Sequence, residues 1–327
     1  MIRIIFISIL LGLLLSLMIA NFLIPFLKKI NVRQEVSIYL KEEHKKKNHT
    51  PTMGGLIFII PPILAIIVGL ITNKVAFSYN LVIVIITFFM YSLIGFIDDF
   101  LIIKRHNNEG LSEASKMFLQ VISAIIFFYF FLKAGNEPLL WIHFLNLKLN
   151  IGFLYGFLIL LVLVGSSNAV NLTDGLDGLA GGLSLIAFLT FSIILINTGW
   201  LEGYIEITIF VLILIGALIG FLFFNLNPAK IFMGDTGSLS LGALLGTIAI
   251  LTRHELLLIL IGIVFVIETM SCLIQRIYYK FTKKRIFFMT PIHHTFEHKM
   301  GEVTVVRIFY LIGIIGAILA LIYGVLL

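Results

Sequence analysis

Charged residues and cysteine are both scarce in this sequence. Of its 327 residues, 12% are Asp, Glu, Lys or Arg, whereas 60% are hydrophobic. Water-soluble globular domains are not built from this composition, so we expect a membrane protein. The single cysteine, Cys272, lies in an apolar run. One cysteine excludes a disulfide framework and a cysteine-based zinc site.

Long apolar runs dominate what is present. A helix needs about 20 apolar residues to cross a bilayer, and ten runs approach that length. No internal repeat, low-complexity tract or soluble insertion separates them, so we expect a single all-α integral membrane domain over residues 1–327. The first run is too long for a signal peptide and ends in a basic stop-transfer pattern. The ten runs are 4–24, 53–72, 80–97, 117–133, 151–170, 178–196, 204–224, 237–252, 256–278 and 304–326.

Basic residues are unevenly divided between alternate loops. The loops after the first, third, fifth, seventh and ninth runs hold 17 of the 23 Lys and Arg residues. The positive-inside rule places these loops in the cytoplasm and both termini on the outer side of a bacterial inner membrane. The net charge of +6 therefore reflects topology and attraction to anionic lipid or substrate, and we expect no nucleic-acid partner.

Aspartates stand at the ends of two runs in these basic loops. Asp98 and Asp99 end the third run, at a helix C-terminus whose dipole is already negative, so the pair needs a cation. A magnesium or phosphate-handling site and a solvated pair at the membrane boundary are both open. Asp235 precedes the eighth run, where helix N–H groups favour a diphosphate or a metal-bound carboxylate, although simple N-capping is the alternative. Phe232 either stacks on a base or anchors in lipid.

A third polar string lies between the fifth and sixth runs. Asn171, Asp174 and Asp177 recur every three residues, so a helical turn would place them on one face. Gly175 beside them lets a backbone or ligand approach closely. The plainer interpretation is that Asp174 caps the sixth run.

The remaining polar strings in these loops contain lysine and histidine. Lys47 ends a lysine run that is either a topology signal or a phosphate contact. The segment from His294 to His298 fits an inverted zinc-protease pattern, but a protease would leave the aspartates unexplained. Glu268 in the ninth run is a functional candidate or a partner in a helix-to-helix hydrogen bond, and Gln275 shares its helix face.

Taken together, these strings resemble the phospho-N-acetylmuramoyl-pentapeptide transferase (translocase I) family, within the polyprenyl-phosphate N-acetylhexosamine-1-phosphate transferases. Their order and spacing extend over nearly the whole chain. One departure is Thr295, where the family commonly has a third histidine. The strings are TPTMGG at 50–55, GFIDD at 95–99, SNAVNLTDGLDGLAGG at 167–182, FMGDTGSLSLG at 232–242, FVIET at 265–269 and PIHH at 291–294.

The resemblance implies a magnesium-dependent transfer of phospho-N-acetylmuramoyl-pentapeptide from UDP to undecaprenyl phosphate, which releases UMP and forms lipid I for peptidoglycan synthesis. It implies that Asp235 ligates Mg²⁺ and that Asp98, Asp99 and Asp235 are catalytic. The residues that it places in the nucleotide-sugar site are Lys47, Asn171, Asp174, Gly175, Asp177, Phe232, Gln275, His293 and His294.

Several alternatives remain open from the sequence. The related N-acetylglucosamine-1-phosphate transferase is the second enzyme candidate. A transporter or channel is the candidate from another class, but its polar groups would cross the midplane instead of gathering at one face. The acceptor phosphate is largely dianionic at neutral pH, which favours direct attack, with Asp98 as an orienting group or proton acceptor, over a covalent Asp98 intermediate. The third residue of the peptide and the oligomeric state, a homodimer included, stay undetermined.

Overall fold

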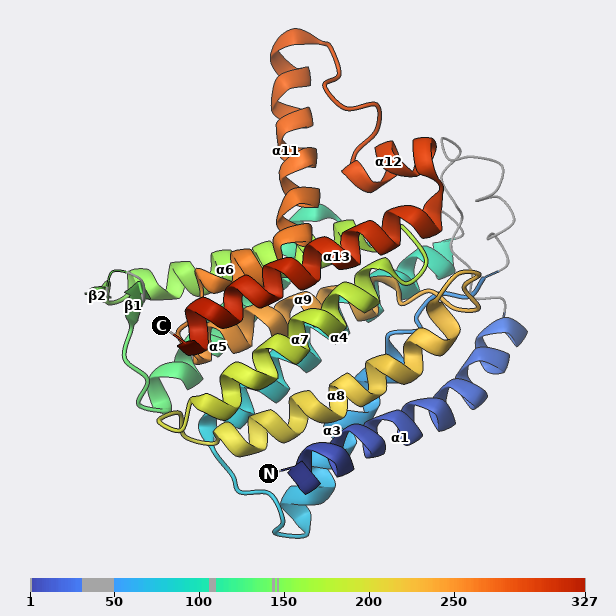
Figure 1. Cartoon of the computed structure of the whole chain (residues 1–327). Helices are drawn as coiled ribbons and strands as arrows, with labels where there is room; N and C mark the ends of the chain where they lie inside the picture. The colour runs from blue at the N-terminus through green and yellow to red at the C-terminus, as the bar shows by residue number, and fades with distance from the viewer. Residues whose placement is uncertain (1, 31–49, 106–109, 143–144, 146, 327) are drawn as a thin grey trace.

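The computed structural model describes residues 2–30, 50–105, 110–142, 145 and 147–326. Its helices run back and forth between the two ends of a bundle (Figure 1). The membrane-length helices are α1 (Ile2–Lys29), α4 (Tyr79–Arg105), α5 (Glu113–Lys133), α6 (Leu154–Thr173), α7 (Leu179–Asn197), α8 (Tyr204–Asn225), α9 (Gly234–Leu251) and α13 (Glu302–Leu321). The shorter ones are α3 (Leu56–Ile71), α10 (Leu257–Ile261), α12 (Ile292–Met300) and the π-helical turn η3 (Ile322–Leu326), and α11 (Ile263–Thr282) has 20 residues but is less apolar.

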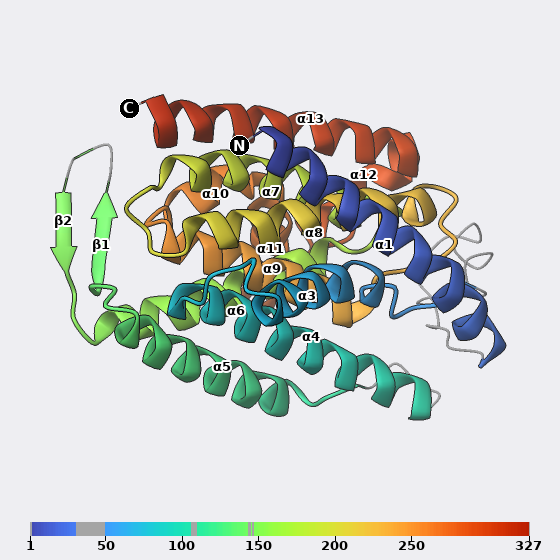
Figure 2. The ribbon, with the colours of Figure 1, turned by 90° about the horizontal axis from the view of Figure 1, so that it is seen from below.

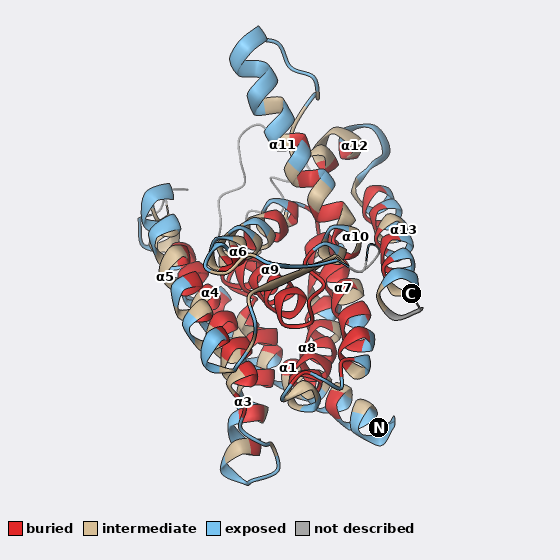
Figure 3. Ribbon diagram, turned by 90° about the vertical axis from the view of Figure 1, so that its left-hand side faces the viewer, coloured by how far each residue is buried: buried red, intermediate tan, exposed pale blue. Residues whose placement is uncertain are grey.

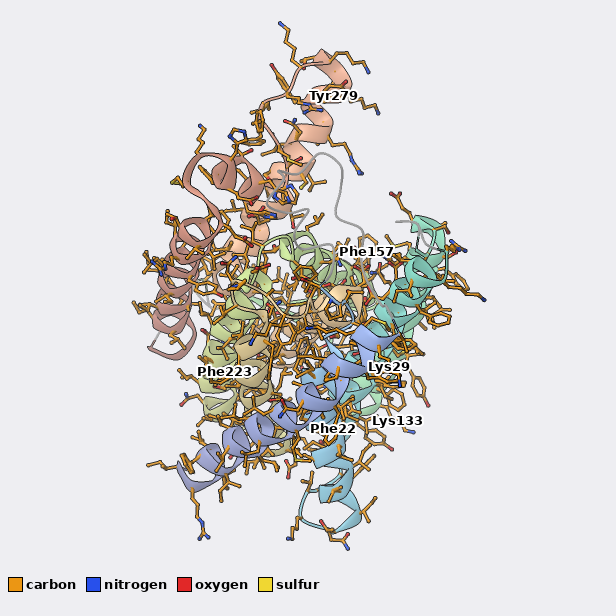
Figure 4. The ribbon with its side chains drawn as sticks, turned by 90° about the vertical axis from the view of Figure 1, so that its right-hand side faces the viewer. Phe22, Lys29, Lys133, Phe157, Phe223 and Tyr279 are labelled. Carbon is orange, nitrogen blue, oxygen red and sulfur yellow. The ribbon has the colours of Figure 1, made fainter. Side chains whose placement is uncertain are left out.

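The described chain contains eight helices that are long and apolar enough to cross a membrane, and they coincide with eight of the ten predicted runs. Helix α3 falls on the second run but has 16 residues, a length of about 24 Å. Large apolar side chains face outward on the bundle, among them Phe22, Phe157 and Phe223 (Figure 4). The protein is therefore a multi-pass, mainly helical membrane protein, as predicted.

The ninth run is the clearest departure from prediction. A single helix over 256–278 was expected, but the chain breaks at Gly262, whose φ of −101° and ψ of 28° are not helical. Glycine is roughly 1 kcal/mol less favourable than alanine within a helix, so interrupting the helix at Gly262 sacrifices little helix stability. After it, α11 leaves the bundle and projects away from the other helices (Figure 1, Figure 3). The prediction of one continuous ninth span is wrong.

A short antiparallel hairpin also departs from the all-α expectation. Strand β1 (Leu139–Ile142) pairs with β2 (Leu147–Asn150), with Leu139 opposite Asn150. The hairpin extends from one end of the bundle, toward which the start of α1 and the end of α13 also point (Figure 2). We call this the hairpin end. The opposite end, where α4 finishes and α9 begins near Asp98, Asp99 and Asp235, is the aspartate end.

Helix α9 forms the centre of the bundle and is buried on nearly all sides (Figure 3). Helices α4 and α6 pack against it closely because small residues line the contacts. A Cβ added at Gly242 would lie 2.3 Å from the carbonyl oxygen of Ser166, and one at Gly95 would lie 2.1 Å from that of Asp235. Close backbone approach of this kind is typical of membrane helix packing. It brings the end of α4 against the first turn of α9.

Candidate active site

The carboxylate of Asp99 caps α9 from a different helix. It accepts the backbone N–H groups of Asp235 (3.1 Å) and Thr236 (3.0 Å), and the Thr236 hydroxyl (2.6 Å). These N–H groups begin α9 and have no partner within it. Asp235 does not cap the helix itself, since α9 has no side-chain cap of its own. Asp99 therefore fixes the position of Asp235.

Lys116 lies between the two other catalytic candidates. Its Nζ is 3.2 Å from Asp98 Oδ1 and 2.9 Å from Asp235 Oδ2. The Leu111 N–H also donates to Asp98 Oδ1 at 2.9 Å, and the Asn171 amide donates to Asp235 Oδ1 at 2.7 Å. The sequence did not single out Lys116, because a lysine at the start of a membrane span is explained by the positive-inside rule alone. Asp98, Lys116 and Asp235 lie on three different helices, α4, α5 and α9, so no sequence motif contains them.

Asp174 follows the last residue of α6 and lies in the turn before α7. Burial, together with the charges of Asp235, Asp99 and Asp177, raises the pKa of Asp174 to about 8. Among the described residues, the ammonium of Lys116 pairs with Asp98 and Asp235, while Asp99 and Asp174 add two further carboxyl groups close to Asp235. A bound cation would relieve the repulsion among these carboxyl groups.

Asp177 acts on Asp174 through its charge, but the hydrogen bonds of its carboxylate join it to other segments. Its Oδ2 accepts the Asn227 amide (3.1 Å) and the Ala229 N–H (3.0 Å), and its own N–H donates to Glu302 Oε1 at 2.7 Å. The expectation that Asn171, Asp174 and Asp177 share one helical face is wrong, because α6 ends at Thr173. In this structure, Asp177 joins the α6–α7 turn to the segment before α9 and to the first residue of α13.

The segment before α3 is bonded to the segment before α9 through the backbone. Pro51 O accepts the Phe232 N–H (2.8 Å), while the Gly54 N–H donates to Phe232 O (2.8 Å) and the Gly55 N–H to Met233 O (2.9 Å). A Cβ at Gly55 would lie 2.5 Å from the Gly237 backbone, which explains the need for glycine there. Phe232 is thereby held beside Asp235 with its side chain partly exposed. Lys47 lies outside the described residues.

The two histidines begin α12 and pack on the α6–α7 turn. His293 is fully buried, with Nδ1 3.2 Å from the equally buried Glu268 Oε2. A Cβ at Gly175 would lie 2.3 Å from His293 Nε2, so glycine is required for this contact. His294 Nδ1 lies 3.1 Å from Glu297 Oε2. In the described chain, no three His, Cys, Asp or Glu side chains form a metal-binding group.

Gln275 is placed farther out, on α11. Its Oε1 accepts the N–H groups of Ile286 (3.0 Å) and Phe287 (3.1 Å), which ties the segment after α11 back to the helix. The Thr295 hydroxyl donates to Met289 O (2.6 Å) and accepts the Met289 N–H (3.0 Å). Both side chains thus hold the segment from 283 to 291 in place.

An apolar cavity of about 380 Å³ lies between α6, α9, α10 and α11. Its wall on α6 extends from Leu158 to Val170, a distance of about 18 Å. Val170 immediately precedes Asn171, so one end of the cavity lies beside the aspartate cluster. Such a cavity suits a hydrocarbon chain whose polar end reaches the cluster.

Comparison with known proteins agrees with this arrangement. Residues 81–253 match the family model described as glycosyl transferase family 4, and residues 47–59 match phospho-N-acetylmuramoyl-pentapeptide-transferase signature 1. A phospho-N-acetylmuramoyl-pentapeptide-transferase of Staphylococcus epidermidis is 44% identical over 98% of this chain and 99% of its own length. That of Oceanobacillus iheyensis is 41% identical over 96% of this chain and 95% of its own length. The chain therefore belongs to the phospho-N-acetylmuramoyl-pentapeptide-transferase family.

Proposed function

We propose that this chain transfers phospho-N-acetylmuramoyl-pentapeptide from UDP to undecaprenyl phosphate, releasing UMP and forming lipid I. The observation that carries the proposal is the Asp98–Lys116–Asp235 arrangement at the start of α9, with Lys116 Nζ 3.2 Å and 2.9 Å from the two carboxylates. Transfer of a phosphoryl group depends mainly on positioning and charge neutralisation, and this cluster supplies both. The signature over 47–59 and the named relatives support the muramoyl-pentapeptide donor.

We also propose that the aspartate end faces the cytoplasm of a bacterial inner membrane. The basic loops that the sequence predicts there support this orientation by the positive-inside rule. Both the water-soluble donor and the membrane-bound acceptor then reach the same end of the bundle. The apolar cavity beside α6 is suited to part of the polyprenyl tail of the acceptor, with its phosphate near Asn171.

Asp235 is the residue that would hold Mg²⁺. Its carboxylate is oriented by Asn171 and lies in a cluster where, among the described side chains, carboxylates outnumber cations. Magnesium is usually bound by one or two carboxylates together with waters and substrate phosphates, so a site at Asp235 does not require three protein carboxylates. Bound there, the ion would neutralise charge on the donor diphosphate.

The chemistry of the chain's own residues favours direct attack. An oxygen of the lipid phosphate attacks the phosphorus that bears the sugar, the bond to the UMP oxygen breaks, and UMP leaves. The carboxylate of Asp98 is paired with Lys116 and accepts the Leu111 N–H, which makes it a poor nucleophile. It is well placed to orient the acceptor and to take its residual proton. Lys116 stabilises the negative charge that gathers at the transferred group.

The test is a UDP-sugar exchange assay on purified protein with undecaprenyl phosphate and Mg²⁺. Radiolabelled UMP should exchange into UDP-N-acetylmuramoyl-pentapeptide and not into UDP-N-acetylglucosamine. Exchange with the N-acetylglucosamine donor alone would instead assign the chain to that related activity. A burst of UMP without any lipid acceptor would establish the covalent route through Asp98.

A further inference from the structure

A cavity of about 720 Å³ lies outside the aspartate cluster, between α11 and the segment that returns to α12. Two arginines and two aromatic rings line it: Arg276 and Tyr279 on α11, and Arg285 and Phe288 on the returning segment. Tyr279 lies near the outer end of the projecting helix (Figure 4). The volume is in the range of sites that bind small ligands.

The cavity lies beside the site that handles the phosphates. Leu172 contributes to its wall and directly follows Asn171, whose amide is bonded to Asp235. Pro291 contributes from the other side and precedes the two histidines of α12. A ligand whose phosphates lie at Asp235 could therefore extend a flexible arm into the cavity.

The polar face of α11 looks into this cavity, and its apolar face does not. The residues that line it, at 272, 275, 276 and 279, have the spacing of one helix face. Leu273, Ile277 and Phe281 lie on other faces and are 45%, 58% and 80% exposed, as expected for contact with lipid. Gln275, Arg276 and Arg285 thus place polar groups in a cavity whose other walls are largely apolar, which suits a ligand that carries a charged group at the end of a partly apolar chain.

Its charge selects for an anion. The sequence has no Asp or Glu between Thr269 and Phe296. Over the described residues, neither Arg276 nor Arg285 takes part in an ion pair. The guanidinium group binds carboxylates through paired hydrogen bonds, so two such groups over one cavity suit a terminal carboxylate.

We propose that this cavity binds the peptide arm of the donor, with the terminal carboxylate of the peptide on Arg276 and Arg285. The inference rests on the proposed function, because it requires a donor that carries a peptide. The peptide is joined to the muramoyl group through its amino end, so its free end is a carboxylate. Five extended residues span at most about 17 Å, which lets the arm reach beyond the phosphate site. The two arginines then discriminate against a UDP-sugar that lacks the peptide.

The experiment measures KM and kcat for three donors on full-length protein: UDP-N-acetylmuramoyl-pentapeptide, its C-terminal amide, and UDP-N-acetylmuramoyl-tripeptide. The variants are Arg276→Gln, Arg285→Gln and the double variant. The matched controls are Lys280→Gln and Lys284→Gln, which remove charge nearby without altering the cavity wall. Thermal unfolding and gel filtration check that each variant folds, and KM for undecaprenyl phosphate is measured in parallel.

For the wild type, the amide and the tripeptide donors should have a KM about tenfold or more above that of the pentapeptide donor. The double variant should raise KM for the pentapeptide donor by a similar factor and leave the other two donors unchanged, while kcat and the controls stay near wild type. An equal loss with all three donors overturns the inference and leaves the proposed function intact. A change in KM for the lipid acceptor alone overturns it in favour of a lipid headgroup site. Wild-type protein that does not use the pentapeptide donor overturns the proposed function, and the inference with it.

Discussion

The two ends of the bundle both bury charged side chains, but they neutralise them differently. At the hairpin end, Arg253 donates to Tyr155 Oη (3.2 Å) and to Leu139 O (3.0 Å), and the Tyr155 hydroxyl donates to Glu255. One cation thus faces one carboxyl group through a shared hydroxyl. At the aspartate end of the described chain, the one ammonium of Lys116 pairs with both Asp98 and Asp235, and the carboxyl groups of Asp99 and Asp174 lie close to Asp235 without a cation of their own.

This difference separates a structural cluster from a functional one. Buried charges are tolerated in a fold where each finds a partner, as Arg253 and Glu255 do through Tyr155. An unbalanced cluster destabilises the unliganded protein and persists where a ligand completes it. Substitution at the aspartate end is therefore expected to lower activity, whereas substitution at the hairpin end should alter stability and leave turnover unchanged.

The largest effect is expected from neutralising the unbalanced cluster. Asp235→Asn and Asp98→Asn should each lower kcat/KM by about 1000-fold or more, because each removes charge at the point of phosphoryl transfer. Relief of repulsion should leave the thermal unfolding midpoint unchanged or slightly higher. Near-normal turnover in Asp235→Asn would remove the basis for placing the metal there.

Asp99→Asn distinguishes two roles within the aspartate end, because Asp99 caps α9 whereas Asp98 does not. Both oxygens of Asp99 accept hydrogen bonds from the start of α9, and an amide group would turn a donor toward those donors. This variant should lose stability as well as activity, by about 1–3 kcal/mol of unfolding free energy. Denaturation in detergent with purified Asp98→Asn as the control checks it, and equal stability of the two variants would contradict the capping role.

Lys116→Gln is expected to have the next largest effect. Removing the cation between Asp98 and Asp235 should lower kcat by about 100-fold, since a charge that stabilises the transition state is lost. Lys133→Gln is a useful control, because Lys133 lies at the far end of α5 over the ring of Tyr79 (Figure 4). Steady-state UMP release distinguishes the two, and an equal loss in both variants would count against a specific role for Lys116.

Gly175→Ala should have a smaller effect, limited to the donor site. The added methyl group would meet His293 Nε2 at 2.3 Å, so α12 must shift away from the α6–α7 turn. We expect KM for the donor to rise about tenfold while KM for the lipid acceptor is unchanged. Gly199→Ala serves as the control because nothing lies within 4 Å of its added Cβ.

The smallest effect on activity is expected at the hairpin end. Burial raises the pKa of Glu255 from 4.5 to about 7, with the Tyr155 hydroxyl and Arg253 facing the carboxyl group. The unfolded chain loses this proton near pH 4.5 and the folded protein near pH 7, so stability is highest below that window and falls across it. Glu255→Gln should keep wild-type turnover.

A thermal unfolding series from pH 4.5 to 8 tests the prediction for Glu255. The wild-type midpoint should fall by a few degrees more than that of Glu255→Gln across this range. Identical slopes for the two proteins would show that Glu255 titrates alike in the folded and unfolded states.

Much of the fold was predictable, because hydropathy and length report directly on membrane helices. Eight predicted runs correspond to membrane-length helices. The break at Gly262 was not predictable, since a single glycine within an apolar run is tolerated in many helices. The hairpin of β1 and β2 was missed because its strands have four residues each.

The composition of the candidate site was easier to predict than its geometry. The aspartate strings were visible because carboxylates are rare in this sequence, and Asp98, Asp99 and Asp235 do meet. Their separate roles depend on partners distant in sequence, such as Thr236 for Asp99 and Lys116 for Asp98. The direction of Asp177 depends on where α6 ends, which is one of the least certain features of any sequence-based prediction.

The central claim is that the negative charge at the aspartate end exists to hold Mg²⁺ and the donor diphosphate. Its most direct test is UMP release from UDP-N-acetylmuramoyl-pentapeptide with undecaprenyl phosphate, measured against Mg²⁺ concentration after removal of metal with EDTA. The account predicts no release without the ion, saturable recovery in the wild type, and no recovery in Asp235→Asn at the same concentrations. Full release in EDTA, equal in the wild type and in Asp235→Asn, would contradict it.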